Sequence, residues 1–191
     1  GNRETGPAFE HMIALCNATD RNMWINVPHL ADADFITKLA QLIRFGSDGG
    51  DPHTVATPGA LFPPLEPGLK VYIEYSNEIW SSGFAFPQGN WAQQQAVDEG
   101  LATDLNDFAG RAEFNARKFV DVWRSFETVF GGTTRLVRVA ATFTANNTYT
   151  DAFLAEIESY GNDPLEGAAT EPDVLAITTY FGHAIQDFVD E

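Results

Sequence analysis

The 191-residue sequence is poor in cysteine and in basic residues. Its one cysteine, Cys16, excludes an internal disulfide framework and any metal cluster built from several cysteines. Eleven Lys and Arg stand against 27 Asp and Glu, which gives a formal net charge of −16. That balance argues against binding to nucleic acid or to an anionic membrane surface, because both are recognised through basic side chains. Neutral substrates remain compatible with it.

Long apolar runs and nucleotide-binding loops are also missing from the sequence. No apolar run reaches the length that a membrane-spanning helix needs. No expected strand is followed by a G-x-G-x-x-G turn, and the GxxxxGK[ST] pattern does not occur. We therefore expect no membrane association and no nucleotide cofactor.

Periodic segments alternate between helix-like and strand-like patterns along the whole chain. The expected helices cover residues 7–19, 32–45, 103–130, 151–160 and 184 onward, and the expected strands cover 22–28, 71–76, 136–142 and 174–180. Residues 46–70 are rich in Gly and Pro and predict an irregular insertion, and 79–90 predict a loop. This alternation favours an α/β fold with parallel strands.

Four strands, each followed by a helix, are about half of a (β/α)8 barrel, which needs about 250 residues. We therefore expect residues 1–191 to form a single partial TIM barrel domain that is truncated at both ends. A small doubly wound sheet is the alternative, although the missing Gly-rich turn counts against it.

The run VYIEYSNEIW places Asn77 and Glu78 at the end of the second expected strand. A carboxylate at the carboxyl end of a barrel strand lies where active sites are built in that fold. Neighbouring Tyr75, Ile79 and Trp80 would desolvate the carboxyl group, as a general acid working near neutral pH requires. A solvated glutamate at a strand end explains the same residues equally well.

The segment IEYSNEIW resembles the fourth-strand signature of the clan A glycoside hydrolases, in which an Asn-Glu pair ends the strand. The resemblance implies that Glu78 is the general acid/base and that Asn77 contacts the sugar 2-hydroxyl. The preceding WINVP strand agrees, and the chain is similar to secreted bacterial barrel glycosidases over nearly its whole length, from the third to the sixth strand. This resemblance also implies an extracellular or cell-surface location for the protein.

A second catalytic carboxylate is expected outside this chain. Retaining glycosidases need two carboxylates about 5–5.5 Å apart, and in clan A the nucleophile is a Glu that ends the seventh strand. The sequence stops after the sixth, so the remaining barrel half would supply it. Glu74 lies four residues before Glu78, about 13 Å along an extended strand. We expect Glu74 to pair instead with Arg138 on the neighbouring strand.

Other residues at strand ends are candidates for sugar binding, because aromatic rings and amide or imidazole groups are suited to sugars. These candidates are Trp24, Asn26, Trp80, Tyr180 and His183. Core packing is the alternative for each of them.

Two groups of acidic residues and histidines are weak candidates for a metal site, and we expect none. They are His29, Asp32 and Asp34, and Asp48, Asp51 and His53. Asp32 is better explained as a helix cap.

The sequence thus predicts part of a retaining hydrolase of β-glycosidic bonds in oligosaccharides or polysaccharides, working without a cofactor. One alternative is a degenerate barrel that binds carbohydrate without cleaving it. Another is an unrelated barrel enzyme such as a lyase or aldolase, although this half has no strand-end Lys for a Schiff base.

Overall fold

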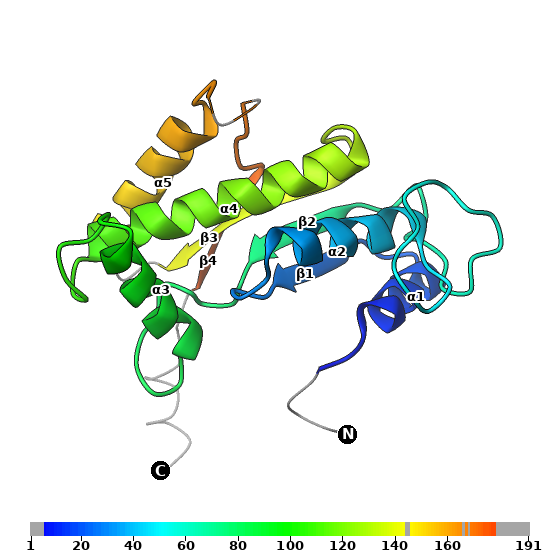
Figure 1. The fold of residues 1–191 in the computed structure, drawn as a ribbon, viewed down its shortest axis with the longest axis horizontal. Helices are drawn as coiled ribbons and strands as arrows, with labels where there is room; N and C mark the ends of the chain where they lie inside the picture. The colour runs from blue at the N-terminus through cyan, green and yellow to red at the C-terminus, as the bar shows by residue number, and fades with distance from the viewer. Residues whose placement is uncertain (1–5, 144–145, 166, 168, 179–191) are drawn as a thin grey trace, which may run out of the picture.

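The computed structural model describes residues 6–143, 146–165, 167 and 169–178, which alternate between helices and strands (Figure 1). The elements in chain order are α1 (Phe9–Thr19), β1 (Met23–Val27), α2 (Ala33–Phe45), β2 (Val71–Tyr75), α3 (Pro87–Asp98), α4 (Phe108–Phe130), β3 (Leu136–Phe143), α5 (Asn147–Gly161) and β4 (Val174–Thr178). None of the described helices is long and apolar enough to cross a bilayer.

The strands form one open, parallel sheet in the order β1-β2-β3-β4, the same as their order in the chain. In register, Ile25 of β1 lies beside Ile73 of β2, which lies beside Arg138 of β3. The predicted α/β class with parallel strands is therefore confirmed.

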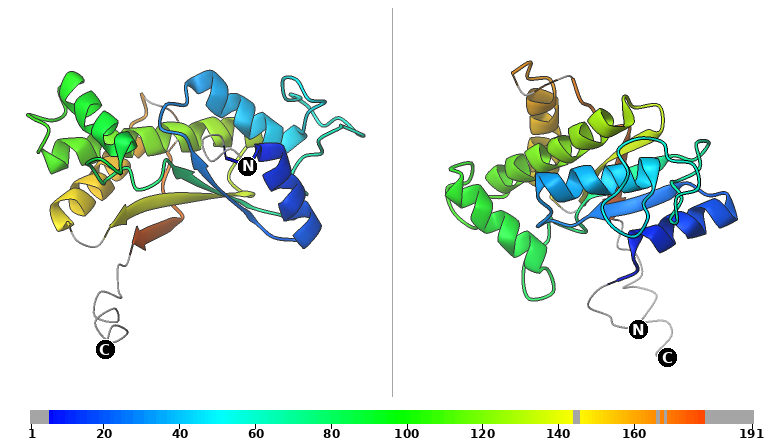
Figure 2. Two further views of the ribbon diagram at one scale, coloured as in Figure 1. Left: turned by 90° about the horizontal axis from the view of Figure 1, so that it is seen from below. Right: turned by 45° about the vertical axis from the view of Figure 1, so that its right-hand side comes forward.

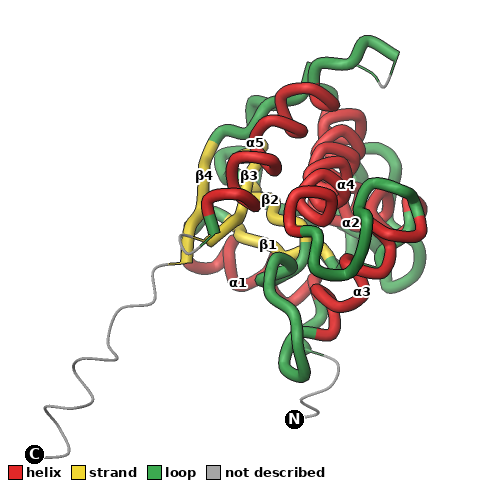
Figure 3. The backbone as a smooth tube through the Cα atoms, turned by 90° about the vertical axis from the view of Figure 1, so that its left-hand side faces the viewer, coloured by secondary structure: helices red, strands yellow, loops and turns green. Residues whose placement is uncertain are grey.

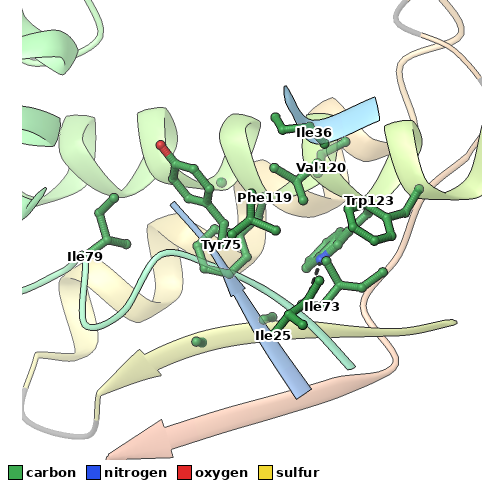
Figure 4. Packing of buried hydrophobic residues seen from close by; sticks show 14 of the residues in the cluster. Ile25, Ile36, Ile73, Tyr75, Ile79, Phe119, Val120 and Trp123 are labelled. Atoms are coloured by element: carbon green, nitrogen blue, oxygen red, sulfur yellow. Dashed lines mark hydrogen bonds between the residues drawn. The ribbon is translucent and has the colours of Figure 1, made fainter. Parts of the chain in front are cut away.

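Helices α2, α4 and α5 cover one face of this sheet, with α4 in contact with both of the others (Figures 1 and 2). The view in Figure 3 shows α2 and α4 beside the layer of strands. Ile25, Ile73 and Tyr75 point from the strands into this layer and meet Phe119 and Trp123 of α4 (Figure 4).

Strand β1 shows which side of the sheet is covered. Met23, Ile25 and Val27 are buried, whereas Trp24 and Asn26 are exposed on the opposite face. Because successive side chains of a strand point to opposite faces, the sheet has a helix-covered face and an open face.

Local capping signals place both ends of α2 and the end of α4 where the sequence predicts them. Asp32 caps α2 by accepting a 2.8 Å hydrogen bond from the backbone N–H of Phe35. Gly46 (φ 77°) and Gly131 (φ 70°) end α2 and α4 in the left-handed region, which a glycine adopts at little cost. Phe35, in the first turn of α2, is 41% exposed although it is apolar.

Helix α3 was not predicted. It starts at Pro87, inside the segment 79–90 that the sequence predicts to be a loop. Proline is compatible with the first helical turn, where its missing N–H has no intrahelical partner anyway. Gly89 then lets the helix approach the chain at Ser81, since a Cβ there would lie 1.5 Å from the Ser81 carbonyl oxygen.

The starts of α4 and α5 differ from the prediction for the same physical reason. Asp107 accepts from the backbone N–H of Gly110 at 3.0 Å, so α4 starts at Phe108 and not near residue 103. Asn146 accepts from the N–H of Tyr149 at 3.0 Å, which lets α5 begin four residues earlier than expected.

Candidate functional site

The chain turns sharply at the end of β2. The strand stops at Tyr75, and both Ser76 (φ 61°) and Glu78 (φ 46°) adopt left-handed backbone conformations. Such conformations cost a non-glycine residue roughly 1–2 kcal/mol each. Strain of this kind is concentrated at functional sites in proteins, so the two residues mark the turn as a candidate site.

Neighbouring segments hold this turn in place. The backbone N–H of Ser76 donates to the carbonyl of Val27 at 2.7 Å, and its carbonyl accepts from Asn26 Nδ2 at 2.6 Å. Gln88 Nε2, from α3, donates to the carbonyl of Asn77 at 2.7 Å. The turn is therefore fixed by β1 on one side and by the unpredicted helix α3 on the other.

The left-handed conformations of Ser76 and Glu78 change the path of the backbone between Glu74 and Glu78. Burial is the main cause that raises the pKa of Glu74, and the negative charge of Glu78 raises it further. Hydrogen bonds from Trp24 and Asn26 act in the opposite direction. The 13 Å separation expected for an extended strand does not apply, because the strand ends at Tyr75, before Glu78.

The expected ion pair between Glu74 and Arg138 is wrong. Arg138 is the register partner of Ile73, so its side chain points to the helix-covered face, opposite to Glu74. There it forms ion pairs with Glu127 at 3.0 Å and with Asp173 at 2.9 Å. The alternation of side chains along each strand does not show which residues of β2 and β3 pair, so the sequence did not reveal that Arg138 and Glu74 point to opposite faces.

Glu74 is held on the open face by a residue of β1. Its Oε2 accepts a 3.0 Å hydrogen bond from Trp24 Nε1, and only 9% of the residue is exposed. The Trp24 ring stacks on Tyr72, with ring centroids 5.3 Å apart and an angle of 10° between the planes. Trp24 remains 46% exposed, so an apolar ring surface lies next to a buried carboxyl group.

Carbohydrate recognition combines such surfaces with hydrogen-bonding groups that fix the orientation of the sugar. Asn26 is exposed and is the register partner of Glu74, and Asn77 is exposed at the turn. A hollow of about 280 Å³ lies at this end of the sheet, and the residues that line it include Asn26, Ser76, Asn77 and Gln88. The geometry thus brings an amide-lined hollow to the turn that carries Glu78.

The remaining predicted site residues lie elsewhere. Trp80 is 3% exposed and belongs to the core, which is the packing alternative to a substrate contact. Tyr180 and His183 lie outside the described residues. The sequence analysis did not name Tyr72 or Gln88 as site residues. Tyr72 could have been found, because it lies two residues before Glu74 on β2 and therefore on the same face of the sheet.

The two groups considered for metal binding have other partners. Asp34 and Asp51 form ion pairs with Lys38 at 3.0 and 3.4 Å. Asp48 lies 3.4 Å from His53. Among the described residues, no three His, Cys, Asp or Glu side chains gather as a metal site would require.

Comparison with protein families, with curated proteins and with solved structures finds no match. Any functional assignment therefore depends on the chemistry of the residues around Glu78.

Proposed function

We propose that this chain is part of a (β/α) barrel glycoside hydrolase that cleaves β-glycosidic bonds with retention, and that Glu78 is its general acid/base. The observation that carries the proposal is the strained turn at the carboxyl end of β2, which carries Glu78. Active sites of barrel enzymes lie at this end of the strands.

The arrangement of the sheet supports a barrel segment. Parallel strands in chain order with α2, α4 and α5 on one face are what successive βα units of a barrel produce. In the complete barrel, further strands would pair with the free edges of β1 and β4, and the open face would become the interior.

In this mechanism Glu78 protonates the oxygen of the leaving sugar and then deprotonates the incoming water. The nucleophilic carboxylate comes from a strand in the remaining barrel half. Asn77 contacts the 2-hydroxyl, and Trp24 offers its exposed ring to the sugar, with Asn26 beside it. Tyr180 and His183 are further contacts in this proposal. No cofactor takes part.

The test compares unmodified enzyme with Glu78→Gln in the full-length gene product. The variant should lose about 10²–10⁴-fold in kcat/KM on a natural oligosaccharide, since a general acid contributes that much. On a dinitrophenyl glycoside, whose leaving group needs no protonation, the first bond cleavage should be much less affected. Glu158→Gln, on the exposed side of α5, is the matched control and should leave both activities unchanged.

Near-normal activity of Glu78→Gln on the oligosaccharide would contradict the assignment. The exposed Trp24 also fits a protein that binds carbohydrate without cleaving it. In that case the full-length protein binds polysaccharide, releases no sugar from it, and binds equally well with Gln at position 78.

A further inference from the structure

Two arginines line an open pocket of about 420 Å³ at the amino ends of the strands. Arg44 lies in the last turn of α2, and Arg135 directly precedes β3. The last turns of α2 and α4 lie on the same side of the molecule (Figure 1), and Gly131, which ends α4, also lines the pocket. The pocket therefore lies at the opposite end of the sheet from the turn that carries Glu78.

Arg44 keeps one edge of its guanidinium available. Its Nη1 donates to the carbonyl of Val129, in the last turn of α4, whereas Nε and Nη2 have no hydrogen-bond partner in the described part of the chain. Neither of these two nitrogens is fully buried, so both reach solvent. Nη1 and Nη2 lie 3.6 and 3.9 Å from the position that a Cβ would take at Gly131, which places the guanidinium at the wall of the pocket. Nε and Nη2 share one edge of the guanidinium and form the fork that binds two oxygens of one oxyanion.

Arg135 is held in one orientation by backbone carbonyl groups. Its Nε donates to Leu69 at 3.1 Å, and its Nη2 donates to Leu65 at 2.9 Å and to Glu66 at 2.8 Å. Its Nη1 has no partner among the described residues and is not fully buried. The side chain is therefore fixed before any ligand binds, with one NH₂ group left to donate.

Both guanidinium groups pack near the same aromatic ring. The Cζ atoms of Arg44 and Arg135 lie 5.9 and 5.6 Å from the ring centroid of Phe130. Burial lowers the pKa of Arg135, and the positive charge of Arg44 lowers it further. The two like charges thus repel each other, and an anion bound by both would remove that repulsion.

The positive charge of this pocket is only partly compensated. The arginines that form ion pairs in the described part of the chain are Arg117 and Arg138, and the described residues that line the pocket include no Asp or Glu. Glu66 acts on Arg135 through its charge, but it is exposed to solvent, which screens such an interaction. The carboxyl ends of α2 and α4 contribute about half a negative charge each. About one positive charge therefore remains for a ligand.

We propose that Arg44 and Arg135 form a binding site for a small oxyanion with the chemistry of inorganic phosphate. Arg44 donates two parallel hydrogen bonds to the ion through Nε and Nη2, and Arg135 donates a third through Nη1. The hydroxyl of Thr134, which also lines the pocket, can donate another. The volume lies in the range of small-molecule sites, so the phosphate group of an organic molecule suits the same donors. The bound ion would link the end of α2 to the start of β3.

Calorimetric titration of the full-length gene product with inorganic phosphate, at constant ionic strength, tests the proposal. Saturable binding is expected for the unmodified protein. Arg44→Met should weaken it at least about tenfold, because hydrogen bonds to a charged group are lost. Arg117→Met is the matched control and should bind phosphate like the unmodified protein, because it removes an arginine of α4 that is already paired with Glu156 at 2.7 Å.

A titration of the unmodified protein that shows no saturable binding would overturn the proposal, as would equal affinities of the unmodified protein and Arg44→Met. If Arg44→Met does not fold, Arg44→Lys keeps the charge but loses the guanidinium fork, and it should also bind phosphate at least about tenfold more weakly. Titration with glycerol phosphate distinguishes the two sources of the ion. Tighter binding than that of inorganic phosphate assigns the site to a phosphate monoester, and equal or weaker binding assigns it to the free ion. None of these measurements depends on glycosidase activity.

Discussion

Trp24 and Glu74 are joined across two neighbouring strands by a 3.0 Å hydrogen bond from the indole Nε1 to the carboxyl Oε2. This bond ties a half-exposed aromatic ring to a buried acid. The orientation of the ring and the ionisation of the acid therefore depend on each other.

Trp24→Phe removes this hydrogen bond and keeps an aromatic ring against Tyr72. Because the bond from Trp24 lowers the pKa of Glu74 against the effect of burial, its loss should raise that pKa further. A ¹³C NMR titration of the Glu74 carboxyl carbon measures the change. An unchanged or lower pKa in the variant would contradict the geometry described here.

Glu74→Gln should stabilise the protein more at pH 7 than at pH 4. Burial raises the pKa of Glu74 in the folded state above its usual value of 4.5, so the folded protein binds this proton more tightly than the unfolded chain does. The contribution of Glu74 is therefore favourable at low pH and is lost as the pH rises through the folded pKa. Glutamine carries no such charge.

Urea unfolding at the two pH values gives the free energies for this comparison. Glu66→Gln, at an exposed position, is the control and should change stability equally at both. The prediction fails if the difference between Glu74→Gln and the unmodified protein does not depend on pH.

Ser76→Gly should increase the free energy of unfolding by about 1 kcal/mol, because glycine adopts the left-handed conformation without the Cβ penalty. Ser82→Gly, on an exposed loop where φ is not positive, should instead leave stability unchanged or slightly lower it. Denaturant midpoints compare the two variants. A destabilised Ser76→Gly would mean that the serine side chain contributes more than the backbone strain costs.

Gly89→Ala should disturb the contact between α3 and the turn that carries Glu78. The added Cβ would meet the Ser81 carbonyl oxygen at 1.5 Å, so the helix must shift. Overpacking of this kind costs roughly 3 kcal/mol, measured as a lower midpoint in urea. Gly68→Ala, where nothing lies within 4 Å, should be close to neutral. Equal effects of the two substitutions would contradict this close approach.

Features with a local physical cause were predictable from the sequence. Asp32 caps a helix and Gly46 ends it because each residue type favours those positions in any protein. The alternating burial of β1 follows from strand geometry in the same way. The parallel α/β class follows from the order of such segments along the chain.

Features that depend on distant partners were not predictable. Serine and glutamate do not favour a left-handed backbone, so Ser76 and Glu78 gave no signal for it. Hydrogen bonds from the distant Asn26 and Gln88 help to hold that turn. The partner of Arg138 depends on the register between β2 and β3. The burial of Trp80 depends on which face the helices cover.

The match between strand order and chain order affects how the protein is made. A ribosome releases the N-terminal end first, so each new strand finds the strand it must pair with already in place. Pairing then needs only the closure of the one or two helices and the loops that lie between successive strands, and the entropy cost of closure grows only slowly with their length. The sheet can therefore grow during synthesis one strand at a time, always at its newest edge.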